Sequence, residues 1–208
     1  DYPGEWLLDL PLLSKSYAEW SAETLERAAR GSHAVLAADW LAATRAVAPD
    51  APEDEATARR LAALFTDYLT AARADEHALS ALPPGRFLMP GDLEGSPALT
   101  FAPLPPGGAT VSKSLAAMME RRYEAYKDVV VRPFFRDHFA RLDRQIVLVD
   151  ALQALNAGPR AVADLAEALA DILACFRPGK TSWLASILTR RIDRIVFAAT
   201  KADHLHRT

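Results

Sequence analysis

The chain has 208 residues, a formal net charge of -3 and a single cysteine, and 50% of its residues are hydrophobic. This length is sufficient for a sizeable core. The slightly acidic charge argues against nucleic acid as a partner, and one cysteine excludes an internal disulfide and indicates a reducing, cytoplasmic location. No apolar run approaches the ~20 residues of a membrane-spanning helix. Cys175 lies in an apolar helical pattern, which favours a core residue over a nucleophile.

The chain begins on the residues D-Y-P-G (1–4), which match the pattern D-x-x-G. In GTPases the aspartate of this pattern holds Mg²⁺ through a water molecule, and the glycine N–H reaches the terminal phosphate. Asp1 and Gly4 have the required residue types, but so short a pattern also recurs by chance. We therefore treat residues 1–13 as a candidate switch element at the start of a nucleotide-binding core, an assignment that depends on the rest of the chain.

Residues 14–142 are predicted to be mostly helical, because apolar side chains recur there at helical spacing. The predicted helices run from Ser16 to a stop at Gly31, over about 36–47 up to Pro49, from about 53 to 79, from an N-cap at Ser112, and from Pro133 at a first helical position. Their apolar stripes are typical of a core rather than of a cofactor site. Four aspartates with helical neighbours are interpreted as surface or helix-cap residues: Asp9, Asp39, Asp137 and Asp143.

Residues 83–106 interrupt the helical pattern with a stretch that is rich in proline and glycine. Such composition predicts a long irregular loop or linker. It also contains more large apolar side chains than a tether needs, namely Phe87, Leu88, Met89, Phe101 and Leu104. We therefore expect this segment to pack against the rest of the protein.

The hydrophobic period changes in residues 143–208. The apolar run 146–149 ends on Asp150 and is typical of a strand buried on both faces. A helical pattern starts near 156–159, and a second apolar strand follows at 194–199. Strand, helix and strand form a βαβ unit, so the two strands should be parallel with a right-handed crossover. The predicted fold class is α/β, with a large all-helical insertion that makes the chain mostly helical by residue count.

The second predicted strand ends on Thr200-Lys201-Ala202-Asp203, which has the form [N/T]-K-x-D of the guanine-specificity element in P-loop GTPases. The Asp203 carboxylate could accept hydrogen bonds from both N–H donors on one edge of guanine, whereas adenine would leave it unpaired. The Lys201 stem would lie along the purine face, and Thr200 would tie the loop to its neighbours. Ligands of open parallel sheets bind beyond the carboxyl ends of the strands, where this motif lies.

Two other patterns resemble a phosphate-binding site and a metal-binding site. Residues 179–181 (Gly-Lys-Thr) imitate the end of a Walker A loop, but the full motif requires a glycine where Ala174 stands, and a strand before it. We interpret this stretch as a polar loop between helices. His204 and His206 lie beside Asp203 but have no third metal ligand at suitable spacing, which favours a solvated loop.

Five longer sequence segments are more specific to one protein family than these short motifs. They are DYPGEWLLDLPLL at 1–13, VRPFFRDHF at 131–139, DRQIVLVD at 143–150, ALNAGP at 154–159 and ATKADH at 199–204. Together and in this order they resemble the YcjX-like family, bacterial stress-associated P-loop NTPases with a Ras-like GTPase core and a large helical insertion. The resemblance implies that residues 1–13 and 143–208 belong to the core and that residues 14–142 form the insertion.

The resemblance also implies a site for GTP or GDP with Mg²⁺. Asp1 would bind Mg²⁺ through water, and the Gly4 amide would contact the γ-phosphate. Glu5 stands where many GTPases have a glutamine that orients water, so its carboxylate could orient or deprotonate the attacking water. Residues 200–203 would recognise the guanine base.

The sequence departs from the family pattern in one respect. The G-x-x-x-x-G-K-[S/T] phosphate loop occurs nowhere in it, and the chain starts on the switch element itself. We therefore expect an incomplete part of a GTP-hydrolysing protein that does not hydrolyse GTP alone. In a Ras-like sheet the strand at 146–149 would lie beside an absent strand, so its apolar edge should make the isolated chain prone to aggregation.

Two alternatives remain open from the sequence. The first is an ATPase of the same fold, in which the motif at 200–203 is only structural. The second is a helical protein-interaction module, with a candidate partner surface on residues 14–142 and the nucleotide fold as a regulatory switch.

Overall fold

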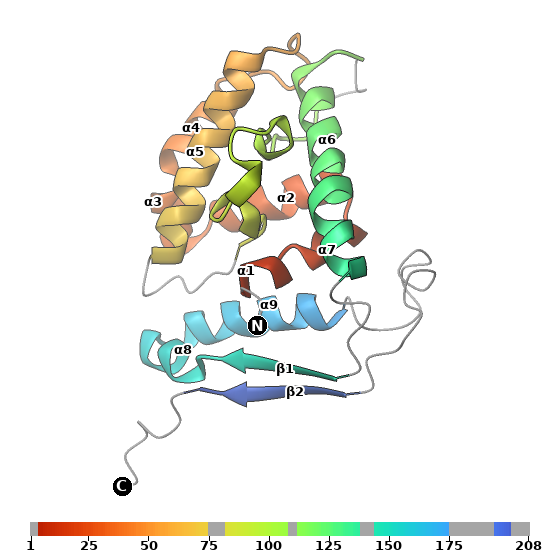
Figure 1. Cartoon of the computed structure of the whole chain (residues 1–208). Helices are drawn as coiled ribbons and strands as arrows, with labels where there is room; N and C mark the ends of the chain where they lie inside the picture. The colour runs from red at the N-terminus through yellow and green to blue at the C-terminus, as the bar shows by residue number, and fades with distance from the viewer. Residues whose placement is uncertain (1–3, 75–81, 108–111, 138–143, 175–193, 201–208) are drawn as a thin grey trace, which may run out of the picture.

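The computed structural model describes five segments, which are residues 4–74, 82–107, 112–137, 144–174 and 194–200. Their helices form a large helical region, and their two strands form a small sheet (Figure 1). Helix α9 lies between the sheet and the helical region, so one face of the sheet is covered by helix.

The helical region contains short helices at its start and three longer helices around its core. Its elements are α1 (Gly4–Leu7), η1 (Leu10–Ser14), α2 (Tyr17–Ala28), α3 (Gly31–Leu36), α4 (Ala38–Arg45), α5 (Glu55–Ala74) and α6 (Leu115–Tyr126), followed by a π-helical segment (Lys127–Val131) and α7 (Arg132–Asp137). Helix α2 begins where expected because Ser16 and Glu19 form a reciprocal capping box, in which each side chain accepts from the backbone N–H of the other.

Several helix boundaries differ from the sequence prediction. The helix expected over about 36–47 is α4, and a separate short helix, α3, precedes it and meets it at the buried Ala37. Gly31, expected to stop the first helix, is instead the first residue of α3, and α2 already ends at Ala28. The N-cap of α6 is Ser114, which accepts from the Ala117 N–H at 3.2 Å, and Ser112 lies in the preceding turn. Pro133 does not start a separate helix, because α6 continues through the π-helical segment into α7. The α-helical pattern is thus already interrupted ahead of Pro133, which has no N–H to donate.

Aromatic side chains hold the helical region together. Trp20 of α2 stacks on Tyr123 of α6, and its ring contacts Phe65 of α5 and Phe101 edge to face. Phe101 belongs to the segment 83–106 and is completely buried. The prediction that this segment packs on the protein is confirmed, since its aromatic residues complete a core that the helices alone would leave open.

The βαβ portion consists of β1 (Arg144–Val149), α8 (Ala151–Ala157), α9 (Pro159–Ala174) and β2 (Arg194–Ala199). The strands are parallel, as predicted, with Ile146 opposite Val196. Asp150 caps α8 by accepting from the Gln153 N–H at 3.1 Å. Gly158 separates α8 from α9 with a φ of 102°, a conformation that favours glycine.

The prediction that the first strand is buried on both faces is wrong for the described residues. Val147 is 8% exposed, whereas Ile146 and Leu148, which point to the opposite face, are 67% and 68% exposed. The alternation arises because only one face of the sheet is covered by a described helix. Val196, opposite Ile146, is exposed as well. An apolar sheet face therefore remains open next to two unpaired strand edges in the described part of the chain.

We expect this face to make the 208-residue chain self-associate. Replacing both Ile146 and Leu148 with lysine should increase the monomer fraction in size-exclusion chromatography with light scattering, because charged side chains oppose edge and face association. Val35→Lys is the matched control, since Val35 is 78% exposed on α3, away from the sheet. A parent chain that is already monomeric at high concentration would contradict this expectation.

Candidate functional site

The candidate base-recognition motif begins at the carboxyl end of β2. The backbone N–H of Thr200 donates to the carbonyl of Val149 at 2.9 Å, and its hydroxyl donates to the same oxygen at 3.3 Å. Val149 is the last residue of β1, so Thr200 ties the end of β2 to the end of β1. Lys201 and Asp203 lie outside the described residues.

The candidate switch residues lie at the start of the described chain. Gly4 and Glu5 are the first two residues of α1, and Asp1 lies outside the described residues. A cavity of about 430 Å³ is lined by Leu7 and Leu8, which end and follow this helix, and by Val149 and Asp150 at the carboxyl end of β1. The segment that follows Glu5 therefore shares a cavity with the end of β1, next to which Thr200 lies.

Asp9 is the residue that the sequence interpretation missed. It stands at the N-cap position of η1, but its side chain does not cap that helix. It is not a surface residue, because it is only 2% exposed and its carboxylate binds two distant segments. One oxygen, Oδ1, accepts from the Gly85 N–H at 2.7 Å, and Oδ2 accepts from the Tyr126 hydroxyl at 2.5 Å and the Arg86 N–H at 3.4 Å. Burial raises the pKa of Asp9 to about 6, although these hydrogen bonds act in the opposite direction.

The same neighbourhood holds α1 in place. The ring of Trp6 meets Phe134 of α7 edge to face at 4.9 Å, and the guanidinium of Arg86 lies 4.8 Å from the Trp6 ring centre. Together with Asp9, these contacts join the candidate switch element to the segment 83–106 and to the helix that runs from α6 to α7. If α1 moves, these contacts must therefore either break or move together with it.

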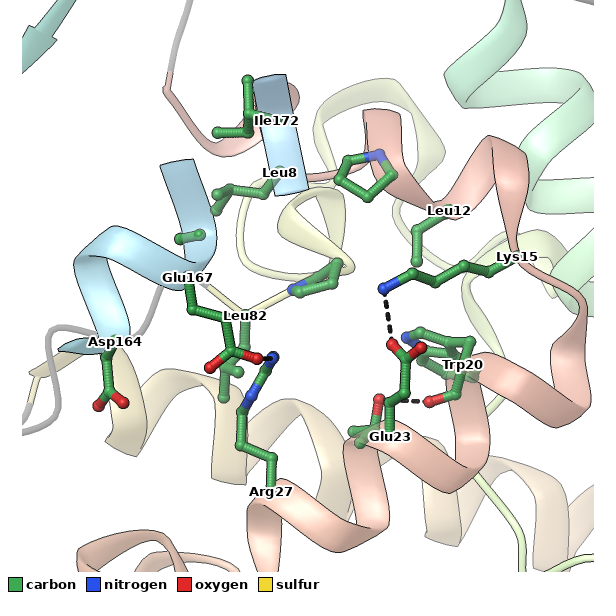
Figure 2. A pocket seen from close by; sticks show the side chains of 14 residues that line it. Leu8, Leu12, Lys15, Trp20, Glu23, Arg27, Leu82, Asp164, Glu167 and Ile172 are labelled. Carbon is green, nitrogen blue, oxygen red and sulfur yellow. Dashed lines mark hydrogen bonds and ion pairs between the residues drawn. The ribbon is translucent and has the colours of Figure 1, made fainter. Parts of the chain in front are cut away.

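The helical region and α9 meet at a second contact, shown in Figure 2. Leu8, Leu12 and Leu82 line a cavity of about 40 Å³ together with Ile172 of α9. Arg27 of α2 pairs with Glu167 of α9 at 2.6 Å. Because both side chains of this ion pair are partly exposed, it contributes little free energy, and the apolar contacts account for most of the attachment.

The described residues carry no group of three or more His, Cys, Asp or Glu side chains placed to hold a metal ion. No described helix is both long enough and apolar enough to span a membrane. Cys175, residues 179–181, His204 and His206 lie outside the described residues. Among the described residues, Thr200 joins the carboxyl ends of β1 and β2, and Leu7 and Leu8 line a cavity with the end of β1.

Parallel strands joined through helices, with a large helical region attached, place the chain in the α/β class. A model of the YcjX-like family matches residues 1–208, and the chain belongs to that family. It is 40% identical to the Ras-like GTPase YcjX of Escherichia coli (strain K12) over 213 residues, which cover 99% of this chain and 45% of that protein. It is 39% identical to the Ras-like GTPase YcjX of Shewanella oneidensis over 215 residues, which cover 100% of this chain and 44% of that protein. The chain therefore spans less than half the length of these curated relatives.

Proposed function

We propose that this chain forms the base-recognition and switch part of a guanine-nucleotide site in a Ras-like core. The observation that carries the proposal is the parallel pair β1 and β2, with Thr200 hydrogen-bonded across their carboxyl ends. Ligands of open α/β sheets bind at this edge. The names of the two relatives, both Ras-like GTPases, support the choice of nucleotide.

The proposed roles follow from the residue types. Asp203 accepts from the guanine base and Lys201 lies along the purine face. Asp1 binds Mg²⁺ through water, Gly4 donates its N–H to the terminal phosphate, and Glu5 orients the attacking water. When bound, Mg²⁺ neutralises charge on the phosphates. We also propose a cytoplasmic, stress-associated role, which rests on the family resemblance and the single cysteine.

The chain by itself should not hydrolyse GTP. Phosphoryl transfer depends on a phosphate-binding loop and its lysine, and the 208 residues contain no G-x-x-x-x-G-K-[S/T] sequence. Phosphate release by the purified chain should equal that of a heat-inactivated control. Turnover above this control would show that the phosphates are bound by other residues of the chain.

The base assignment is tested in a full-length family member that carries the equivalent of Asp203. Changing this aspartate to asparagine replaces one acceptor with a donor, which should weaken GTP binding by about 10- to 100-fold and favour xanthine nucleotides. The equivalent of Asp39→Asn, an exposed carboxylate on α4, is the control. Unchanged GTP affinity would refute the role of Asp203, and equal competition by ATP would favour the ATPase alternative.

A protein-interaction role of the helical region is the second candidate. It is favoured by large apolar side chains that are exposed there, Val35 at 78% and Val129 at 57%. Affinity capture with the whole chain, compared with a variant that carries Val35→Lys and Val129→Lys, would test it. If a captured partner binds the parent chain and the variant equally well, Val35 and Val129 do not belong to its contact surface.

A further inference from the structure

The turn between α1 and η1 attaches the candidate switch element to the helical region. Asp9 lies in this turn, four residues after Glu5. Its carboxylate is buried and accepts from the Gly85 N–H at 2.7 Å and from the Tyr126 hydroxyl at 2.5 Å. These two donors follow Asp9 by 76 and 117 residues. The position of α1 is therefore set by segments that are distant in the sequence.

One face of α6 makes most of this attachment. Tyr123, Tyr126 and Lys127 stand three and four residues apart, the spacing that places side chains on one face of a helix. The Tyr123 hydroxyl donates to the carbonyls of Leu12 and Lys15, at 3.1 Å each. The Lys127 Nζ also donates to the Lys15 carbonyl, at 3.0 Å. The polar face of α6 thus holds the whole segment that follows α1.

The buried carboxylate is not explained by stability alone. Burial raises the pKa of Asp9 to about 6, although its hydrogen bonds act in the opposite direction, so the ionised form is less favourable here than in water. A well-packed apolar side chain in place of a buried charged group is often neutral or stabilising. Hydrogen bonds to a carboxylate differ from apolar contacts in having defined directions. What this contact supplies is therefore a fixed position for the segment that carries it.

We propose that Asp9 is a positioning residue for GTP hydrolysis, which holds α1 against the helical region so that Gly4 and Glu5 stay in place beside the terminal phosphate. This inference rests on the proposed function, in which the Gly4 N–H contacts that phosphate and Glu5 orients the attacking water. The contact of Trp6 with Phe134 of α7 holds the same helix from its other end. Such support matters because a misplacement of ~1 Å can lower a reaction rate about 100-fold.

Tyr126→Phe tests this role, since it removes the hydroxyl that binds Asp9 and keeps the ring. The test uses a full-length family member that carries both residues at the equivalent positions. Its kcat for GTP should fall about tenfold, because the switch residues lose their fixed position. Its affinity for GDP should stay within about twofold of the parent, because GDP has no terminal phosphate for the switch to contact. A general loss of structure would instead weaken GDP binding as well.

The equivalent of Tyr68→Phe is the matched control. Tyr68 is buried too, and its hydroxyl lies 3.0 Å from Nδ1 of His33 on α3, so this variant loses a buried hydroxyl contact within the helical region only. Its kcat should equal that of the parent. An unchanged kcat in Tyr126→Phe, or an equal fall in both variants, would overturn the positioning role.

A second pair of variants shows whether Tyr126 acts through Asp9. In the Asp9→Ala background, Tyr126→Phe should change kcat by less than about twofold, because the contact is already lost. Additive effects of the two substitutions would overturn the role of Asp9. A parent protein that hydrolyses no GTP would refute the proposed function and this role together, whereas a parent that hydrolyses GTP and tolerates Tyr126→Phe would refute the positioning role alone.

Discussion

Replacing Trp20 with alanine should lower the free energy of unfolding by about 3–5 kcal/mol, as other deletions of a buried aromatic side chain do. Trp20 is 1% exposed and lies 5.0 Å from Tyr123 and 5.4 Å from Phe101, measured between ring centres. It also contacts Phe65. The vacated space is bounded by α5, α6 and the segment 83–106, which cannot all move inward together.

Urea denaturation followed by circular dichroism measures this loss. Trp20→Phe should lose less than Trp20→Ala, because a smaller ring still fills part of the site. Val35→Ala, at a position that is 78% exposed, should change the free energy by less than about 0.5 kcal/mol. A loss below about 1 kcal/mol for Trp20→Ala would show that the aromatic core is not what holds the helical region together.

The Asp9 carboxylate should give the chain a distinct pH dependence. Its pKa is about 6 in the folded chain, compared with 3.8 for an ordinary aspartate. The folded state therefore binds a proton more tightly than the unfolded state does. This contribution, about 3 kcal/mol from the size of the shift, is fully present below pH 4 and is lost as the pH rises through 6.

The measurement is the difference in unfolding free energy between the parent chain and Asp9→Asn as a function of pH. The parent should lose stability relative to the variant as the pH rises from about 4 to 7. The effects of the carboxylates that both proteins carry cancel in this difference. Asp39→Asn controls for the loss of one charge at an exposed position. A difference that is constant over this range would mean that the Asp9 pKa is not raised.

Tyr126→Phe tests the same contact from the other side. The tyrosine hydroxyl donates to the Asp9 carboxylate, so its loss should cost about 1.5–3 kcal/mol at pH 7.5. The cost should be smaller at pH 4.5, where Asp9 is mostly protonated and the bond to a full charge no longer exists. An equal cost at both values would mean that the contribution of the hydroxyl does not depend on the charge of Asp9.

Much of the local structure could be predicted from the sequence because it depends on local periodicity. The spacing of apolar side chains predicted α2, the long α5 up to Ala74 and both strands, and the βαβ order predicted their parallel pairing. The capping pair of Ser16 and Glu19 also acts within one turn. The break between helices at Ala37 and the continuation of the helix through Pro133 could not be predicted from local periodicity. Two consecutive helices can have the same spacing of apolar side chains, and tertiary packing can override the intrinsic propensity of a residue.

For the candidate site, the sequence by itself determined the D-x-x-G and T-K-x-D patterns, the absence of a phosphate loop and the family resemblance, on which the proposed chemistry rests. Only the tertiary structure decided that Thr200 bonds to Val149, and that Asp9 is buried against Gly85 and Tyr126, 76 and 117 residues away. The physical reason is that a motif is a property of neighbouring residues. The burial and partners of a polar group depend on segments that the chain brings together only when it folds.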